Sequence, residues 1–316
     1  MTQRKHNKKY ILMKKHNFYH PKFIPTWILI ASMKLGAKIP FGTQVFIGKG
    51  IGRLLYLILP RFRKIALINI AQCFADKNSA QVKKLAQQNF EALGITLFEM
   101  ANCFYLDDDT LKKRYQIHNT QILSDALTQK KNVILLVGHF TTMMLAGRML
   151  LQNFKFADVY RPQNNALFDA EMTKKFTQHG STMIKVKDTR ALIKTLKSGL
   201  PIWYAPDQDL GTQNSVFAPF FGVQTATINA TAKLAKLPNT IVIPLSFIRN
   251  KSGYQLKFSP ALDNYPSSTD QQNAALTNHI LEQQILQAPE QYLWIHRRFK
   301  SRPEGESSFY TPHQKR

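Results

Sequence analysis

Acidic residues are scarce in this sequence. Only 19 Asp and Glu stand against 43 Lys and Arg in 316 residues, which gives a formal net charge of +24. Such an excess favours an anionic partner: nucleic acid, an anionic membrane face, a phosphorylated lipid or an acidic protein. A generic basic soluble protein is the alternative. The sequence has no helix-turn-helix, RNP or zinc-finger pattern. Positive charge is then the only feature in favour of nucleic-acid binding, and we expect no nucleic-acid partner.

Cysteine is almost absent as well. Cys73 and Cys103 form no CxxC pair and no Cys/His spacing that suits a metal. This argues against a zinc site and a disulfide scaffold, and it fits a reducing compartment. The chain also lacks a GxGxxG fingerprint and a P-loop. We therefore expect neither a metal nor a cofactor.

The N-terminal region has no uninterrupted apolar run of the ~20 residues that a transmembrane helix needs. Residues 1–17 are rich in Lys and Arg, and residues 23–33 are apolar until Lys34 interrupts them. No small-x-small cleavage site follows cleanly. We expect a basic cytoplasmic tail over 1–17 and an uncleaved membrane anchor over 18–50, spanning or interfacial, with an ordinary core helix as the alternative. Residues 51–310 are then one membrane-associated α/β domain.

Strand-like and helix-like segments alternate through the second half of the chain. Residues 133–138 form a branched apolar run that ends in glycine, which is typical of a strand buried on both faces. Other strands are expected at 156–161, 183–186, 201–209, 240–248 and 253–260, and helices at 76–105, 120–129, 140–151, 166–179, 189–197 and 227–237. The alternation predicts a mostly parallel α/β sheet flanked by helices.

A histidine and three charged residues follow these predicted strands. His139 comes directly after the central strand, where open α/β sheets place their ligand crevice. Arg161, Asp207 and Asp209 would lie at the same edge, and Arg161 suits a phosphate. The side chains of Asp207 and Asp209 point the same way if their strand continues. The alternative for these two residues is that they cap and stabilise a turn. The alternative for His139 is that it only packs at a strand end. The backbone N–H groups that follow His139 would serve an oxyanion.

Four blocks in the chain resemble the late acyltransferases of lipid A biosynthesis, the Kdo2-lipid IVA lauroyltransferase family. They are VYRPQNN (159–165), IWYAPDQDLG (202–211), SVFAPFFGVQTAT (215–227) and APEQYLWIHRRFKSRPEG (288–305). The resemblance implies a glycerolipid-acyltransferase-like fold and an enzyme anchored N-terminally in the bacterial inner membrane, with its catalytic domain on the cytoplasmic face. It also implies transfer of a medium-chain, lauroyl-type acyl group from acyl carrier protein to a hydroxyacyl chain of a phosphorylated, Kdo-bearing lipid A precursor.

The resemblance implies that His139 is the general base on the acceptor hydroxyl. The family motif is a His, four residues and a carboxylate, but the fifth residue after His139 is Met144, a neutral thioether. Three explanations stay open. Asp207 or Asp209 approaches His139 instead; the protein is a weakened or inactive relative that binds anionic lipid or acyl carrier protein; or Met144 is a substitution in an otherwise active enzyme.

The family's Arg-rich turn after the YRP block is a second departure, because this chain has Lys174 and Lys175 there. We expect these two lysines to contact the substrate in place of that turn, together with Arg161 and Asp209 at the strand ends. The expected catalytic residues are His139 and Asp207.

Overall fold

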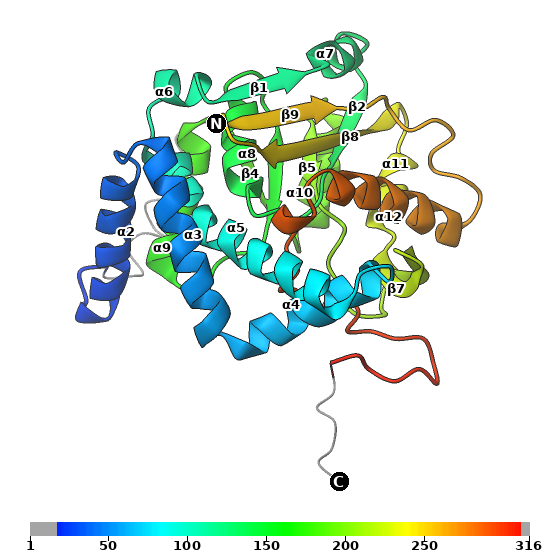
Figure 1. Cartoon of the computed structure of the whole chain (residues 1–316). Coiled ribbons are helices and arrows are strands. Elements are labelled where there is room, and N and C mark those ends of the chain that lie inside the picture. The colour runs from blue at the N-terminus through cyan, green and yellow to red at the C-terminus, as the bar shows by residue number, and fades with distance from the viewer. Residues whose placement is uncertain (1–17, 311–316) are drawn as a thin grey trace.

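The computed structural model describes residues 18–310 and has a seven-stranded sheet at its centre, in the order β1-β9-β8-β2-β5-β3-β4 (Figure 1). The strands are β1 (Tyr115–His118), β2 (Asn132–Leu136), β3 (Ala157–Tyr160), β4 (Thr182–Lys185), β5 (Ile202–Tyr204), β8 (Thr240–Arg249) and β9 (Tyr254–Phe258). β8, β2, β5, β3 and β4 run parallel, and β9 pairs antiparallel with β8. The predicted mostly parallel α/β sheet is confirmed.

The central strand β2 is buried on both faces, as its apolar run predicts. Val133 and Leu135 face the larger core cluster, whereas Ile134 and Leu136 face the smaller one. The first cluster is covered by α5 (Ser79–Tyr105) and α8 (Met143–Leu151), and the second by α10 (Thr189–Lys197) and α11 (Ala230–Ala235). The remaining helices around the sheet are α6 (Asp108–Lys112), α7 (Thr120–Thr128), α9 (Ala166–Gln178), α12 (Asp270–Gln287) and the short η2 (Pro289–Gln291).

The segment expected as an anchor over 18–50 is not one continuous helix. After the short η1 (Pro21–Phe23), it forms α2 (Ile24–Gly36) and the first half of α3 (Phe41–Ile58), which are separated by a turn before Pro40. Proline disfavours helical backbone at the residue before it, which explains this break and the next one at Pro60, where α4 (Pro60–Cys73) begins. Within residues 18–310, no helix combines the length and the apolar character needed to cross a bilayer. The predicted basic tail over 1–17 lies outside the described residues.

Helices α3 and α5 pack with their backbones in close contact, because glycines line the crossing. A Cβ atom added at Gly52 would overlap the carbonyl of Phe90, and one added at Gly94 would overlap the carbonyl of Gly48. α3 therefore lies directly against α5 (Figure 1).

Three local predictions are wrong. The strand expected over 201–209 is limited to β5, and the backbone beyond Tyr204 is irregular. The helix expected over 227–237 begins only at Ala230, because β6 (Ser215–Phe220) and β7 (Val223–Ile228) form an antiparallel hairpin. Its two-residue turn, Phe221-Gly222, has positive φ at both positions, as tight hairpins prefer. The helix expected to follow His139 directly starts at Met143.

Candidate active site

His139 and Asp207 meet at the carboxyl ends of two neighbouring strands. His139 follows β2, Asp207 follows β5, and these strands pair directly. Nδ1 of His139 lies 2.6 Å from Oδ1 of Asp207, and Oδ2 of Asp207 accepts the backbone N–H of His139 at 2.9 Å. One carboxylate thus holds both the ring and the peptide of the histidine.

The charge balance of this pair suits a base. Burial alone would lower the pKa of His139, but the charge and hydrogen bond of Asp207 outweigh it and raise that pKa above its ordinary value. Burial would raise the pKa of Asp207, yet the His139 charge and hydrogen bonds from His139 and Tyr292 hold it well below its usual range. Asp207 is only 1% exposed, whereas the His139 side chain is 25% exposed. With Nδ1–H donated to Asp207, Nε2 of the neutral ring is free to accept a proton.

The chain after His139 is held by a C-terminal segment distant in sequence. Phe140 forms a β-bridge with Tyr292, and the backbone N–H of Leu293 donates to the His139 carbonyl at 2.9 Å. The rings of Phe140 and Tyr292 pack edge to face at 5.5 Å. The block at 288–305 therefore fixes the backbone at His139 and Phe140.

Three of the backbone N–H groups expected as oxyanion donors after His139 already have carbonyl acceptors. The backbone N–H groups of Phe140, Thr141 and Met143 donate to the carbonyls of Gly138, Gln291 and Phe140, at 2.8–3.0 Å. These three N–H groups are therefore taken up by the loop, and the residues do not form the first turn of a helix directly after His139.

His139 opens into a cavity of about 670 Å³ at this edge of the sheet. Its walls are mostly apolar: Met143, Val159, Tyr160, Trp203, Ala205 and Ile228. Its cationic side chains are Arg161, Lys185 and Lys187, which follow or end strands β3 and β4. An apolar chamber with a cationic side can take a ligand that has a hydrocarbon part and an anionic part.

Asp209, Lys174 and Lys175 are not brought to this cavity. Asp209 accepts the backbone N–H of Ser301 at 2.6 Å and the Ser301 hydroxyl at 2.9 Å, so its buried carboxylate ties the C-terminal segment to the 205–211 loop. It does not point with Asp207, because β5 ends at Tyr204 and the backbone beyond it is irregular. Lys174 is exposed on α9, and the Lys175 ammonium lies 4.7 Å from the Tyr105 ring centroid.

Met144, the residue in place of the motif carboxylate, sits in the first turn of α8. Its side chain is half-buried against the larger core cluster, and its carbonyl accepts from the Cys103 thiol at 3.4 Å. Of the three explanations left open, this geometry favours the first, because Asp207 already occupies the Nδ1 side of His139.

Sequence reasoning missed Lys185, Lys187 and Tyr292. The two lysines alternate around Val186 at the end of a predicted strand, so the rule that located Arg161 could have located them. Tyr292 hydrogen-bonds Asp207 from the distant block at 288–305, and no local pattern signals that contact.

Comparison with known proteins agrees with these observations. Residues 12–301 match the family described as bacterial lipid A biosynthesis acyltransferase. The chain is 35% identical over 296 residues to the lipid A biosynthesis palmitoleoyltransferase of Escherichia coli (strain K12), covering 93% of this chain and 96% of that protein. It is 34% identical over 294 residues to the lauroyltransferase of the same organism, covering 92% and 96%. A lipid A biosynthesis acyltransferase of Haemophilus influenzae is 32% identical over 297 residues, covering 92% and 95%. The chain therefore belongs to the bacterial lipid A biosynthesis acyltransferase family.

Proposed function

We propose that this protein transfers a medium-chain, lauroyl-type acyl group from acyl carrier protein to the hydroxyl of a hydroxyacyl chain on a phosphorylated, Kdo-bearing lipid A precursor. The observation that carries the proposal is the His139–Asp207 pair, 2.6 Å apart, at the mouth of an apolar cavity with cationic side chains. A general base, a place for an acyl chain and a place for an anion lie within one site.

In the proposed reaction, Nε2 of His139 takes the proton of the acceptor hydroxyl while the oxygen attacks the thioester carbonyl. A C–O bond forms, the C–S bond then breaks, and the departing thiolate receives the proton from the imidazolium. Asp207 keeps the ring in the tautomer that leaves Nε2 unprotonated and stabilises the imidazolium while it is charged. No step needs an external oxidant or reductant.

The cavity suits both parts of such a substrate. Met143, Val159 and Trp203 offer apolar surface to an acyl chain. Arg161, Lys185 and Lys187 offer positive charge to a phosphate or an acidic sugar. The relatives named after palmitoleoyl and lauroyl transfer are almost equally similar to this chain, at 35% and 34% identity. The lauroyl preference is therefore the part of this proposal that a donor series must decide.

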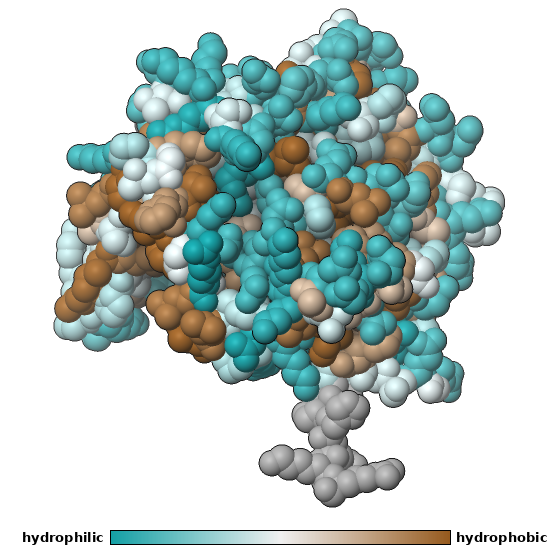
Figure 2. Space-filling model, viewed as in Figure 1, coloured by the Kyte–Doolittle hydropathy of each residue, from teal (hydrophilic) through white to brown (hydrophobic). Residues whose placement is uncertain are grey.

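We also place the enzyme at the cytoplasmic face of the bacterial inner membrane, attached through α2, α3 and the start of α4. Large apolar side chains are exposed along these helices, and Figure 2 shows them gathered on the side where α2 and α3 lie. They are Ile24, Trp27, Ile28, Leu29, Leu35, Phe46, Ile47, Leu54, Leu57, Ile58 and Phe62. Exposed Lys34, Lys49, Arg53 and Arg61 lie on the same helices. Apolar anchors combined with cations are typical of helices that lie in the headgroup layer of an anionic membrane.

The direct test is transfer of radiolabelled acyl groups from acyl carrier protein to purified lipid A precursor. Lauroyl, myristoyl and palmitoleoyl donors are compared, and the product is separated by chromatography. We expect lauroyl transfer by the wild type and its loss in His139→Ala with vesicle binding retained. Unchanged turnover in His139→Ala would refute the assignment of the base.

The alternative is a catalytically weakened or inactive relative, suggested by Met144. It predicts saturable binding of anionic lipid or acyl carrier protein with no acylated product at any enzyme concentration. The hydrogen bond between His139 and Asp207 argues against this alternative, because Asp207 supplies the carboxylate that Met144 cannot.

A further inference from the structure

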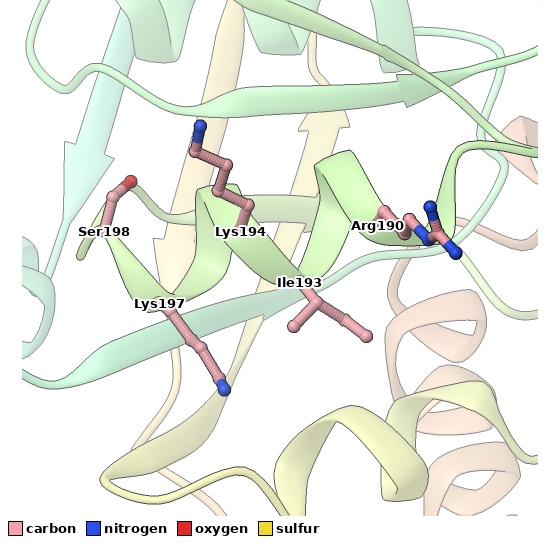
Figure 3. Close-up of a pocket in the computed structure, with 5 residues that line it drawn as sticks. All are labelled: Arg190, Ile193, Lys194, Lys197 and Ser198. Carbon is pink, nitrogen blue, oxygen red and sulfur yellow. The ribbon is translucent and has the colours of Figure 1, made fainter.

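A second basic surface begins where the active-site cavity ends. Lys185 and Lys187 line that cavity at the end of β4, and α10 starts two residues later. The outward face of α10 carries Arg190, Lys194 and Lys197, which border a shallow cavity of about 480 Å³ (Figure 3). We call these three residues the α10 basic face.

The residues of the α10 basic face lie on one side of the helix because of their spacing in the sequence. Positions 190, 194 and 197 are one and two turns apart, so they share one side of the helix. Leu192 and Leu196 lie on the opposite side, buried in the smaller core cluster. The apolar side of α10 therefore holds the helix on the sheet, and the three cations are left facing solvent.

The charges of the α10 basic face are not neutralised by the chain itself. Within residues 18–310, none of Arg190, Lys194 and Lys197 takes part in an ion pair. The only acid between 182 and 200 is Asp188, and its carboxylate caps α10 by accepting the backbone N–H of Ala191 at 3.0 Å. Like charges one turn apart destabilise a helix, so an anionic partner would relieve this arrangement.

The surroundings of α10 indicate a protein partner. The large exposed apolar side chains that suit a membrane are on α2, α3 and α4, and α10 has none of them in the described part of the chain. A surface that is cationic without apolar anchors is complementary to an acidic protein surface more than to a bilayer interior. Lys187 lines the cavity of His139 and precedes Arg190 by three residues, so a partner bound on α10 lies next to the segment that borders that cavity.

We infer that the α10 basic face is the docking surface for the acidic protein that carries the acyl thioester. This inference rests on the proposed function, since it names where the donor of that same site binds. Docking on α10 leaves the acceptor lipid to approach from the membrane-facing helices, so that the two substrates need not compete for one surface.

The test compares Lys194→Glu/Lys197→Glu with the matched control Lys112→Glu/Lys113→Glu. Both variants change the net charge equally, and all four lysines are exposed. The control lysines precede β1, at the opposite edge of the sheet from β4. Binding of lauroyl-acyl carrier protein is measured by fluorescence anisotropy, which needs no turnover. Transfer kinetics are measured with that donor and with lauroyl-pantetheine, a thioester that has no carrier protein.

We expect the α10 variant to weaken carrier binding and raise the KM for the carrier-bound donor by about 10-fold or more, because steering and docking are lost. Its kcat, its transfer from lauroyl-pantetheine and its melting temperature should stay near the wild-type values, and the control should change little. Equal weakening in the control, equal loss with both donors, or a loss of anionic-vesicle binding with carrier binding intact would overturn the inference. If the wild type transfers from neither donor, the proposed function fails, and carrier binding by the two variants still decides the docking surface.

Discussion

Oδ2 of Asp207 accepts the backbone N–H of His139 at 2.9 Å while Oδ1 of the same carboxylate lies 2.6 Å from Nδ1 of the ring. The two contacts make the orientation of the imidazole a property of the β2 and β5 strand ends. A carboxylate one helical turn beyond the histidine is therefore not needed to set the tautomer, and Met144 is compatible with a working base.

Replacing the carboxylate by an amide tests this arrangement. We expect Asp207→Asn to fold and to lower kcat by a factor on the order of 10⁴, because a neutral amide neither selects the tautomer nor stabilises the imidazolium. Acyl transfer and circular dichroism are measured on the single variants and on Asp207→Asn/His139→Ala. The double variant should be no slower than His139→Ala alone. Additive losses would show that Asp207 acts independently of the histidine.

The pH dependence of the site follows from the same pair. His139 must be neutral to act as base, and its pKa is raised, so kcat/KM should fall as the pH drops through a value above ~6.5. In Asp207→Asn the charge that raises the pKa is gone and burial, which lowers it, remains. The His139 titration, followed by NMR of the ring nitrogens, should then move below that of the wild type. A midpoint that does not move would contradict the electrostatic role of Asp207.

Restoring the motif carboxylate should bring little benefit. We expect Met144→Glu to change kcat by less than about 3-fold, because Asp207 already occupies Nδ1, and to lower the melting temperature, because Met144 is half-buried against the core. Met144→Leu is the matched apolar control and should keep both rate and stability. A gain of tenfold or more in Met144→Glu would instead mean that Met144 is a lesion in the motif.

The sequence predicted the edge of the sheet where the site lies and named Asp207 as the carboxylate beside His139, but it also placed Asp209 at the same site. Parallel strands bring His139, Arg161 and Asp207 to one edge, and that follows from chain order and strand patterning alone. The separation of Asp207 from Asp209 does not, because it depends on where β5 ends and on Ser301, which is 92 residues from Asp209.

The prediction of a helix directly after His139 was wrong for a related physical reason. Residues 140–151 have helical composition, but Phe140 and Thr141 pair with Tyr292 and Gln291 and so leave the helix. Long-range backbone pairing overrides local helix preference, and a single sequence carries no local sign of it.

The close backbone contact of α3 and α5 at their glycines predicts how alanine substitutions change the stability of the protein, and α3 also offers a control position. Gly94→Ala should destabilise the protein by ~1–3 kcal/mol, because the new methyl group meets the backbone of Gly48 and Gly52. Gly50→Ala, in α3, meets nothing within 4 Å and should instead stabilise the helix by ~0.5–1 kcal/mol. Chemical denaturation measures both. If the two substitutions have the same effect, the helices are not in backbone contact.

The proposed attachment through α2–α4 is tested by placing charge on its apolar side chains. Phe46 and Leu57 are 77% and 67% exposed on α3, so Phe46→Glu/Leu57→Glu should leave the fold intact. Burying a large apolar side chain in the interface contributes up to ~1.5–3 kcal/mol, so losing two should weaken binding to anionic vesicles by at least about 10-fold in a sedimentation assay. Leu276→Glu/Leu286→Glu changes two exposed leucines of α12 by the same chemistry and is expected to bind vesicles like the wild type. Equal losses in both variants would show that net charge alone drives the association, and that α3 does not enter the membrane surface.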